Sequence, residues 1–99
     1  MITEIADFKV APESRDAFVE AISRGVRTIL SRSTGYRHHQ LLACQESPGR
    51  LVLIVQWDSL EEHTVGFRQS PAFAEWRAII GPFFLQPPHV EHFEAVATG

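Results

Sequence analysis

Cysteine is nearly absent from this chain, and so are the patterns that indicate a metal site or a membrane segment. Cys44 is the one cysteine among 99 residues, which excludes an internal disulfide. No cysteine or histidine spacing suggests zinc, so we expect no metal and no cofactor. The longest apolar run, Leu51 to Val55, is too short to cross a bilayer, and no signal peptide is evident. A cytoplasmic protein is therefore the default expectation.

Charge of one sign is also scarce. The formal net charge is −3, and acidic and basic residues are interspersed instead of forming blocks. Without a basic stripe, we expect neither nucleic acid nor an anionic membrane as a partner. Hydrophobic residues make up 44% of the chain, which is enough for the core of a single domain over residues 1–99. Because so short a chain buries a smaller fraction of its surface than a larger one, burial at a subunit interface would help it.

The periodicity of apolar residues predicts strands and helices in the order β-α-β-β-α-β. In the first strand, Ala6, Phe8 and Val10 share one face. The predicted strands are at about Ile2–Val10, Tyr36–Gln45, Leu51–Asp58 and His89–Val96, and the predicted helices at about Pro12–Arg32, 60–68 and 71–80. This order is the ferredoxin-like plan of the α+β class, with an antiparallel sheet.

The helix boundaries rest on local signals. Ser59 with Glu62 three residues later forms a capping box, which predicts a helix that begins at Leu60. Ser70 before Pro71 repeats the start signal, a side-chain cap followed by proline at the first helical position. We therefore expect two consecutive short helices instead of one long helix.

The middle strands indicate how the sheet is covered. The run from Leu51 to Val55 is apolar on both faces, which places this strand centrally, with helices on one face. In so short a chain, a second subunit is the expected cover for the other face. On the preceding strand, Tyr36, His38 and Gln40 alternate, and we expect them to form one polar stripe.

A longer pattern resembles a known family. The segment Trp57-Asp58-Ser59-Leu60-Glu61-Glu62-His63, continuing to Phe67-Arg68-Gln69-Ser70-Pro71-Ala72-Phe73, resembles the antibiotic biosynthesis monooxygenase family. That family has a strand-ending Trp, a capped acidic helix start and a Ser-Pro-x-Phe second helix. The turn Thr34-Gly35-Tyr36 and the order of elements agree, so the resemblance covers nearly the whole chain. It implies a homodimer that completes a dimeric α/β barrel through the open sheet face.

The resemblance implies more than one possible chemistry. One branch is similar to quinone-forming monooxygenases that use molecular oxygen without metal or flavin. Another branch degrades haem, with an Asn on the first strand, a Trp ending the third and an axial His on the second short helix. Trp57 matches that pattern, but Phe8 and Arg77 occupy the other two positions.

His63 and Arg68 are the candidate catalytic residues. His63 lies one turn before Phe67 on the same helix face, where a neutral imidazole could take a proton from a phenol near pH 7. The alternative is a packing histidine bonded to backbone, because no orienting carboxylate is visible in the sequence. Arg68 could stabilise a developing phenolate or peroxide, although a surface salt bridge to Glu61, Glu62 or Glu75 is the more common role of such a residue. No carboxylate lies four residues from Arg68, which favours a tertiary role.

Aromatic residues supply the walls of a predicted pocket. The candidates for a flat apolar slot between the sheet and the second helical segment are Phe8, Trp57, Phe67, Phe73 and Trp76, with Arg77 able to bind an acidic group. The same aromatics would also serve as a closed core, and Trp57 and Trp76 are those expected to be partly open.

Three functional hypotheses follow. The leading one is a homodimeric, cofactor-independent monooxygenase or quinol oxidase acting on a small aromatic or polycyclic substrate, with His63 as the base. The second is a non-catalytic dimeric module that binds a small aromatic or apolar ligand in the same pocket. The third, haem binding or degradation, requires an axial ligand that the aligned position lacks.

Overall fold

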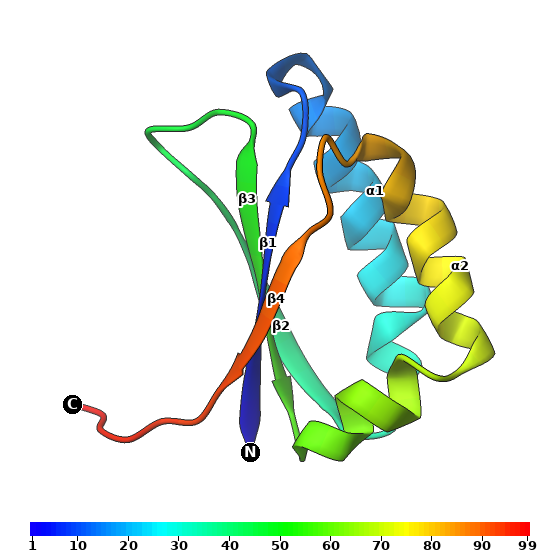
Figure 1. The fold of residues 1–99 in the computed structure, drawn as a ribbon, viewed down its shortest axis with the longest axis vertical. Coiled ribbons are helices and arrows are strands. Elements are labelled where there is room, and N and C mark those ends of the chain that lie inside the picture. The colour runs from blue at the N-terminus through cyan, green and yellow to red at the C-terminus, as the bar shows by residue number, and fades with distance from the viewer.

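The computed structural model describes residues 1–99 and has the predicted order of elements. The strands are β1 (Ile2–Lys9), β2 (Tyr36–Ala43), β3 (Arg50–Trp57) and β4 (His89–Phe93), and the α-helices are α1 (Arg15–Thr28) and α2 (Pro71–Ile80). Both helices cover the same face of the sheet (Figure 1), so the ferredoxin-like α+β prediction is confirmed. None of the helices combines the length and the apolarity that a bilayer span requires.

The sheet is antiparallel, with strand order β2-β3-β1-β4. Side chains that alternate along β3, including Leu51, Leu53 and Val55, are fully buried under the helices. Ala6 and Phe8 of β1 are buried on that same face, as the alternation predicted. The most apolar strands thus occupy the centre, where both edges are hydrogen-bonded and one face is closed.

The start of β2 is bulged, which corrects one prediction. Tyr36 pairs with Trp57, but His38 pairs with the adjacent Gln56, so one residue of β2 has no partner. An extra residue changes the face that the preceding side chain occupies. Tyr36 therefore lies beside Trp57 on the helix-covered face, whereas His38 and Gln40 lie on the open face. The predicted polar stripe that joined these three residues is wrong.

The segment Glu62–Phe67, hereafter the π-helical segment, has π-helical geometry where an α-helix was predicted. The backbone N–H of Arg68 donates to the carbonyl of His63, five residues earlier, at 2.9 Å. Two side chains of the segment, His63 and Phe67, are buried against the sheet. The segment therefore turns an imidazole inward at the end of β3.

One of the two predicted caps is present. The Ser59 hydroxyl accepts a hydrogen bond from the backbone N–H of Glu62 at 3.3 Å, which is one of the two bonds of a capping box. The Ser70 hydroxyl instead donates to the carbonyl of Phe67 at 2.6 Å, so the predicted Ser70 side-chain cap is wrong. α2 still begins at Pro71, because a proline at the first helical position needs no partner for its nitrogen.

Two glycines permit close approaches that shape the interior. A Cβ on Gly25 of α1 would lie 3.1 Å from ring carbons of Trp76, so the bare backbone lets α2 pack closely. Gly35 adopts φ +90, and a Cβ there would lie 2.5 Å from the Glu62 side chain. The first glycine sets the depth of Trp76, and the second lets the π-helical segment lie against the turn before β2.

Candidate functional site

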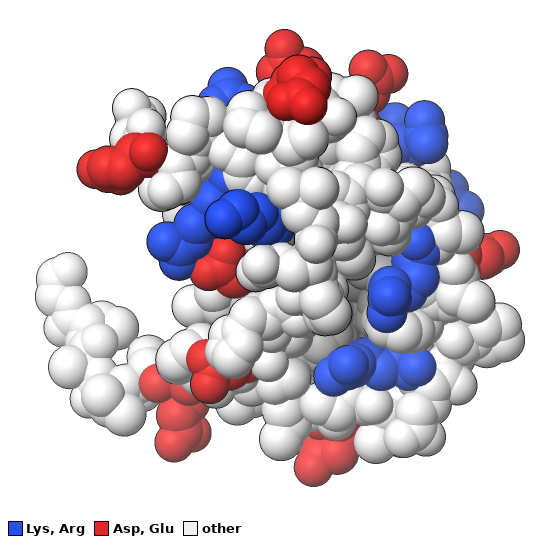
Figure 2. Space-filling model, turned by 45° about the horizontal axis from the view of Figure 1, so that its top comes forward, with Lys and Arg blue, Asp and Glu red and all other residues white.

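A cavity of about 450 Å³ lies between the sheet, the π-helical segment, α2 and the stretch that leads into β4. This volume falls within the range of small-molecule sites. Figure 2 shows a hollow in the molecular surface with Lys or Arg side chains at its border. The predicted wall residues that line the cavity are Phe8, Phe67, Phe73, Trp76 and Arg77. Both predicted catalytic residues, His63 and Arg68, line it as well.

Trp57 is the predicted wall residue that the structure places elsewhere. It is 0% exposed and does not line the cavity, so the expectation that it is partly open is wrong. Trp76 borders the cavity but is only 7% exposed. Trp57 lies in the middle of the sheet, paired with residues of both β1 and β2, and its indole stacks on the ring of His63 at 4.9 Å. It supports the site from behind instead of facing a ligand.

Glu4 of β1 lines the cavity although it was not among the predicted site residues. Its side chain is buried on the same face as Ala6 and Phe8, and Oε1 accepts the Trp57 indole N–H at 2.9 Å. The other oxygen, Oε2, has no hydrogen-bond partner. Every fully buried side-chain oxygen or nitrogen does have a partner, so Oε2 is not fully buried. Oε2 is therefore open to the cavity that Glu4 lines. The alternation of Ala6, Phe8 and Val10, extended back to position 4, would have found this residue.

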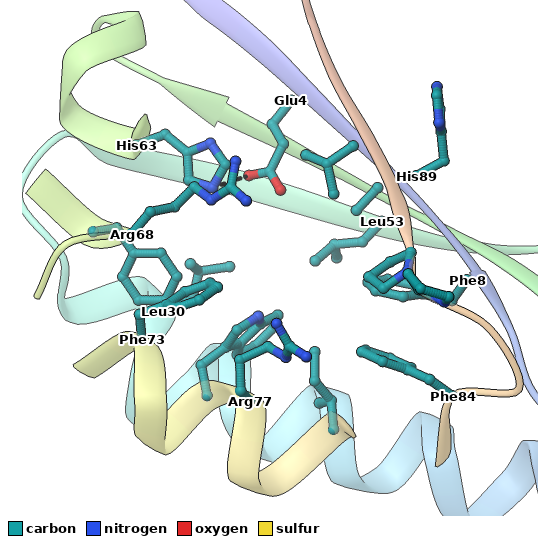
Figure 3. Close-up of a pocket in the computed structure, with 17 residues that line it drawn as sticks. Glu4, Phe8, Leu30, Leu53, His63, Arg68, Phe73, Arg77, Phe84 and His89 are labelled. Carbon is teal, nitrogen blue, oxygen red and sulfur yellow. Dashed lines mark ion pairs between the residues drawn. The ribbon is translucent and has the colours of Figure 1, made fainter. Parts of the chain in front are cut away.

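His63 connects Glu4 to a second histidine. Its Nε2 lies 3.3 Å from Oε1 of Glu4, and its Nδ1 lies 2.7 Å from Nε2 of His92. His92 belongs to β4 and pairs directly with Glu4 across the sheet. Figure 3 shows Glu4 and His63 pointing toward one another at one end of the cavity, with Arg68 beside them. His63 therefore has side-chain partners on both ring nitrogens, including the carboxylate that was not visible in the sequence.

Burial shifts the proton affinities of this group in opposite directions. Desolvation raises the pKa of Glu4 to about 7, against the opposing effects of the Trp57 N–H and the Arg68 charge. Desolvation also lowers the pKa of His63 to about 3, helped by His92 and Arg68. Near pH 7, His63 is thus neutral and its contact with Glu4 is not an ion pair. Glu4 is balanced there between its acid and carboxylate forms, which suits a general base.

Two arginines lie beside the aromatic ring of Phe73. The guanidinium carbons of Arg68 and Arg77 are 5.8 Å and 5.9 Å from the centroid of that ring, within cation–π range. Neither arginine is in an ion pair with a carboxylate. Their positive charge is therefore available to an anion in the cavity.

Aromatic rings form the opposite end of the cavity, hereafter the apolar end, and the guanidinium carbon of Arg77 lies 5.9 Å from the centroid of the Phe84 ring there. Phe8 stacks on Phe84 with ring centroids 5.4 Å apart. Ile80 also lines the cavity. Phe84 lies in the proline-bounded stretch after α2 and was not among the predicted wall residues (Figure 3). The cavity thus joins an ionisable end to an aromatic end.

The polar residues offer no cluster that could chelate a metal ion, and the axial histidine of the haem-degrading branch is missing. Glu4 and His92 contact opposite nitrogens of the His63 ring, so the three groups form a line instead of converging on one point. No group of three metal-ligating side chains occurs in the structure. At the position of the axial histidine of the haem-degrading branch stands Arg77, whose guanidinium has no acceptor to offer iron.

Comparison with known proteins adds a family to this geometry. The family model described as antibiotic biosynthesis monooxygenase matches residues 1–79. The uncharacterised protein YczJ of Bacillus subtilis is 36% identical over 96 residues, which are 97% of this chain and 100% of YczJ. The crystal structure of a putative antibiotic biosynthesis monooxygenase from Bordetella bronchiseptica has 34% sequence identity to this chain, with a TM-score of 0.90 over 97% of both chains. SnoaB of Streptomyces nogalater, a cofactor-independent oxygenase, shares the fold at 20% identity, with a TM-score of 0.80 over 98% of this chain and 94% of SnoaB.

Proposed function

Because this chain belongs to the antibiotic biosynthesis monooxygenase family, we propose that it is a cofactor-independent monooxygenase or quinol oxidase. The proposed substrate is a small aromatic or polycyclic compound that carries a phenol or an activated C–H group. The observation behind this proposal is that Glu4, His63 and Arg68 lie together at one end of an otherwise largely apolar cavity. SnoaB, which shares the fold, is a cofactor-independent oxygenase, and this agrees with the proposed chemistry.

The shape of the cavity suits a flat substrate. Its apolar end, formed by Phe8 and Phe84, would hold the unreactive rings. A ligand placed there would direct its ionisable group toward Glu4 at the other end. Aromatic walls also exclude water, which strengthens each electrostatic contact with the bound substrate.

The first step is removal of a proton from the substrate. Oε2 of Glu4 faces the cavity, and its pKa of about 7 matches the pH at which the carboxylate must both accept and release protons. His63 is neutral at that pH and contacts Oε1 of the same carboxylate, so it is placed to exchange a proton with Glu4. Both residues are therefore proposed catalytic residues, with Glu4 as the proton acceptor.

The second step is electron transfer to oxygen. The substrate anion gives one electron to O₂, and the resulting radical and superoxide combine to a peroxide, which takes the proton back. Loss of water from the hydroperoxide leaves a carbonyl, so one oxygen atom enters the product. With a hydroquinone, a second electron passes instead, and the products are quinone and hydrogen peroxide. The charge of Arg68 would stabilise the phenolate and the reduced oxygen.

We also propose a homodimer that forms through the open face of the sheet. Helices cover only the other face (Figure 1), and the open face carries the partly exposed Val52 and Ile54 of β3 beside Leu42 of β2. A second copy would bury this apolar surface and complete a barrel. Light scattering at micromolar concentration should give the dimer mass, and a monomer mass would contradict the proposal.

Oxygen consumption tests the activity. Metal-stripped protein would be mixed with a panel of hydroquinones and anthrones, beside the variants Glu4→Gln and His63→Ala. We expect uptake above the autoxidation rate in the wild type and a loss of about 100-fold or more in Glu4→Gln, because general base catalysis contributes on that scale. His39→Gln is the control, since His39 is exposed on β2 and lies outside the cavity.

Two outcomes would overturn the proposed function. Absence of uptake with every compound, although a compound binds and quenches Trp76, would indicate a binding module without turnover. Uptake that persists unchanged in both Glu4→Gln and His63→Ala would show that the chemistry does not use this end of the cavity.

A further inference from the structure

We propose that His92 carries protons between the buried pair of Glu4 and His63 and the solvent, so that the three residues form a proton relay. This inference rests on the proposed function, because the relay would serve the proton that Glu4 takes from a substrate. His92 does not line the cavity, so it would act through His63 and not on the ligand.

The three residues form a polar path in which the Glu4–His63 link is a close contact and the His63–His92 link is a hydrogen bond. From Oε1 of Glu4 the path runs 3.3 Å to Nε2 of His63, and from Nδ1 of His63 it runs 2.7 Å to Nε2 of His92. The three residues come from β1, the π-helical segment and β4, so only the folded chain brings them together. His63 is buried and His92 is half-buried, which orders the path from the interior to the surface.

The outer end of the path is open to solvent. Nδ1 of His92 has no hydrogen-bond partner. Every fully buried side-chain nitrogen does have a partner, so this nitrogen is not fully buried. This nitrogen is therefore accessible to water. On the same strand, His89 and Glu91 pair with each other at 2.8 Å and alternate with His92, so they face away from it.

While a substrate fills the cavity, no other side chain in contact with Glu4 can carry the proton away. The Trp57 indole N–H is a donor that cannot accept a proton, and the guanidinium of Arg68 stays protonated. The ionisable groups that face His92 are Glu4, His63 and Arg68. Burial, followed by the Arg68 charge, lowers the pKa of His92, so its ring is neutral at pH 7 and can accept a proton from His63.

The transfer balances at every ring. With the protons of both imidazoles on Nδ1, a half-turn of the Glu4 carboxyl group brings its protonated oxygen to Nε2 of His63. The Glu4 acid then passes its proton to that nitrogen. His63 then passes its Nδ1 proton to Nε2 of His92, and His92 releases its own Nδ1 proton to water. Each ring gains one proton and loses one. When the peroxide needs a proton, the sequence runs in reverse and restores the starting tautomers.

Nuclear magnetic resonance tests the relay without a substrate. In protein labelled with ¹³C at glutamate carboxyls and ¹⁵N in histidine rings, we expect scalar coupling between Nδ1 of His63 and Nε2 of His92. His92→Gln should remove this coupling and move the titration midpoint of Glu4 by about half a pH unit or more, because coupled groups titrate together. His39→Gln should do neither. An unchanged Glu4 midpoint in His92→Gln would overturn the relay.

Turnover supplies the second readout. We expect His92→Gln to lower kcat by about 10-fold with KM unchanged, since proton transfer and not binding is impaired. Added imidazole should restore part of the rate, because it can replace the missing proton carrier. It would not restore the rate if the substitution had only disturbed the structure. An unchanged kcat and pH profile would overturn the relay. If the wild type turns over no compound, the proposed function fails, and the magnetic resonance result alone decides whether the proton path exists.

Discussion

The two ends of the cavity differ in their effect on the stability of the fold. At the apolar end, Phe8 and Phe84 stack as they would in any protein core, and their burial stabilises the fold. At the polar end, Glu4 occupies a position of β1 where the alternation calls for an apolar residue. Its carboxylate is desolvated, and this burial costs stability whenever the group is ionised. The apolar end stabilises the fold, whereas the polar end reduces stability in a way that suits proton transfer.

Breaking the apolar end should have the largest effect. Phe18 of α1 is 0% exposed and lies behind this end, with its ring centroid 5.5 Å from those of Phe8 and Phe83. Phe18→Ala should lower the free energy of unfolding by about 3–5 kcal/mol, measured by denaturant titration. Leu85→Ala, at a residue 60% exposed, should change it by about 0.5 kcal/mol or less. A loss below about 1 kcal/mol in Phe18→Ala would contradict the assignment of this end to the core.

The shifted pKa values of Glu4 and His63 at the polar end should change how the free energy of unfolding depends on pH. The folded pKa of Glu4, about 7, lies above its ordinary 4.5, so the native state binds more protons between these values and stability falls as pH rises. The folded pKa of His63, about 3, lies below its ordinary 6.5, so stability rises with pH over that window. From pH 4.5 to 6.5 the two slopes oppose each other. The wild type should therefore be nearly flat there.

Single variants would separate the two slopes. Over the same window, the free energy of unfolding of Glu4→Gln should rise by about 2 kcal/mol with increasing pH, because only the slope from His63 remains. That of His63→Gln should fall by about 2 kcal/mol, because only the slope from Glu4 remains. These values allow for screening by water in the cavity. Denaturant titrations at several pH values provide the measurement. Parallel pH profiles in the two variants would show that Glu4 and His63 do not have opposite shifts.

A smaller change would test the support behind the site. Trp57→Phe removes the N–H that donates to Oε1 of Glu4 at 2.9 Å while keeping an aromatic ring under His63. Because that bond stabilises the ionised carboxylate, its loss should raise the pKa of Glu4 by about one unit. A ¹³C titration of the carboxyl would measure this, with Trp76→Phe as the matched control. A pKa that stays at about 7 would mean that the indole contributes only packing.

The smallest expected effect concerns Arg68. Its charge lowers the pKa values of Glu4, His63 and His92, so Arg68→Gln should raise all three. Since Arg68 is exposed, we expect a shift of only a few tenths of a unit, reduced further by salt. Arg24→Gln on α1 should leave the three values unchanged. Shifts of opposite sign among the three groups would contradict a simple charge effect.

The sequence predicted the fold well because local periodicity determines most of it. The alternation in β1, the turn at Gly35 and the proline that starts α2 each act within a few residues. The bulge in β2 escaped prediction because it depends on how Tyr36 pairs with a neighbouring strand, which spacing along the chain does not reveal.

The site was predicted less completely, for a related reason. His63 and Arg68 were identified as candidates by residue type, and the structure brings both to the cavity. Glu4 and His92 become neighbours of each other only through the register of β1 with β4, and both meet His63 only where the π-helical segment packs on the sheet. Trp57 was placed in the wall because large aromatics are seldom closed off completely, but its place between two paired strands buries it. The catalytic roles of His63 and Arg68 stay predictions.

The stacking of Trp57 on His63 gives the protein a built-in optical signal. An indole 4.9 Å from an imidazole is quenched when that ring becomes charged, so Trp57 emission should follow the proton on His63. Trp76 borders the cavity and should respond instead to a bound aromatic molecule. Replacing either tryptophan with phenylalanine would leave the other as the only indole. The same unlabelled protein could then be observed in real time, with one fluorophore for protonation and one for occupancy.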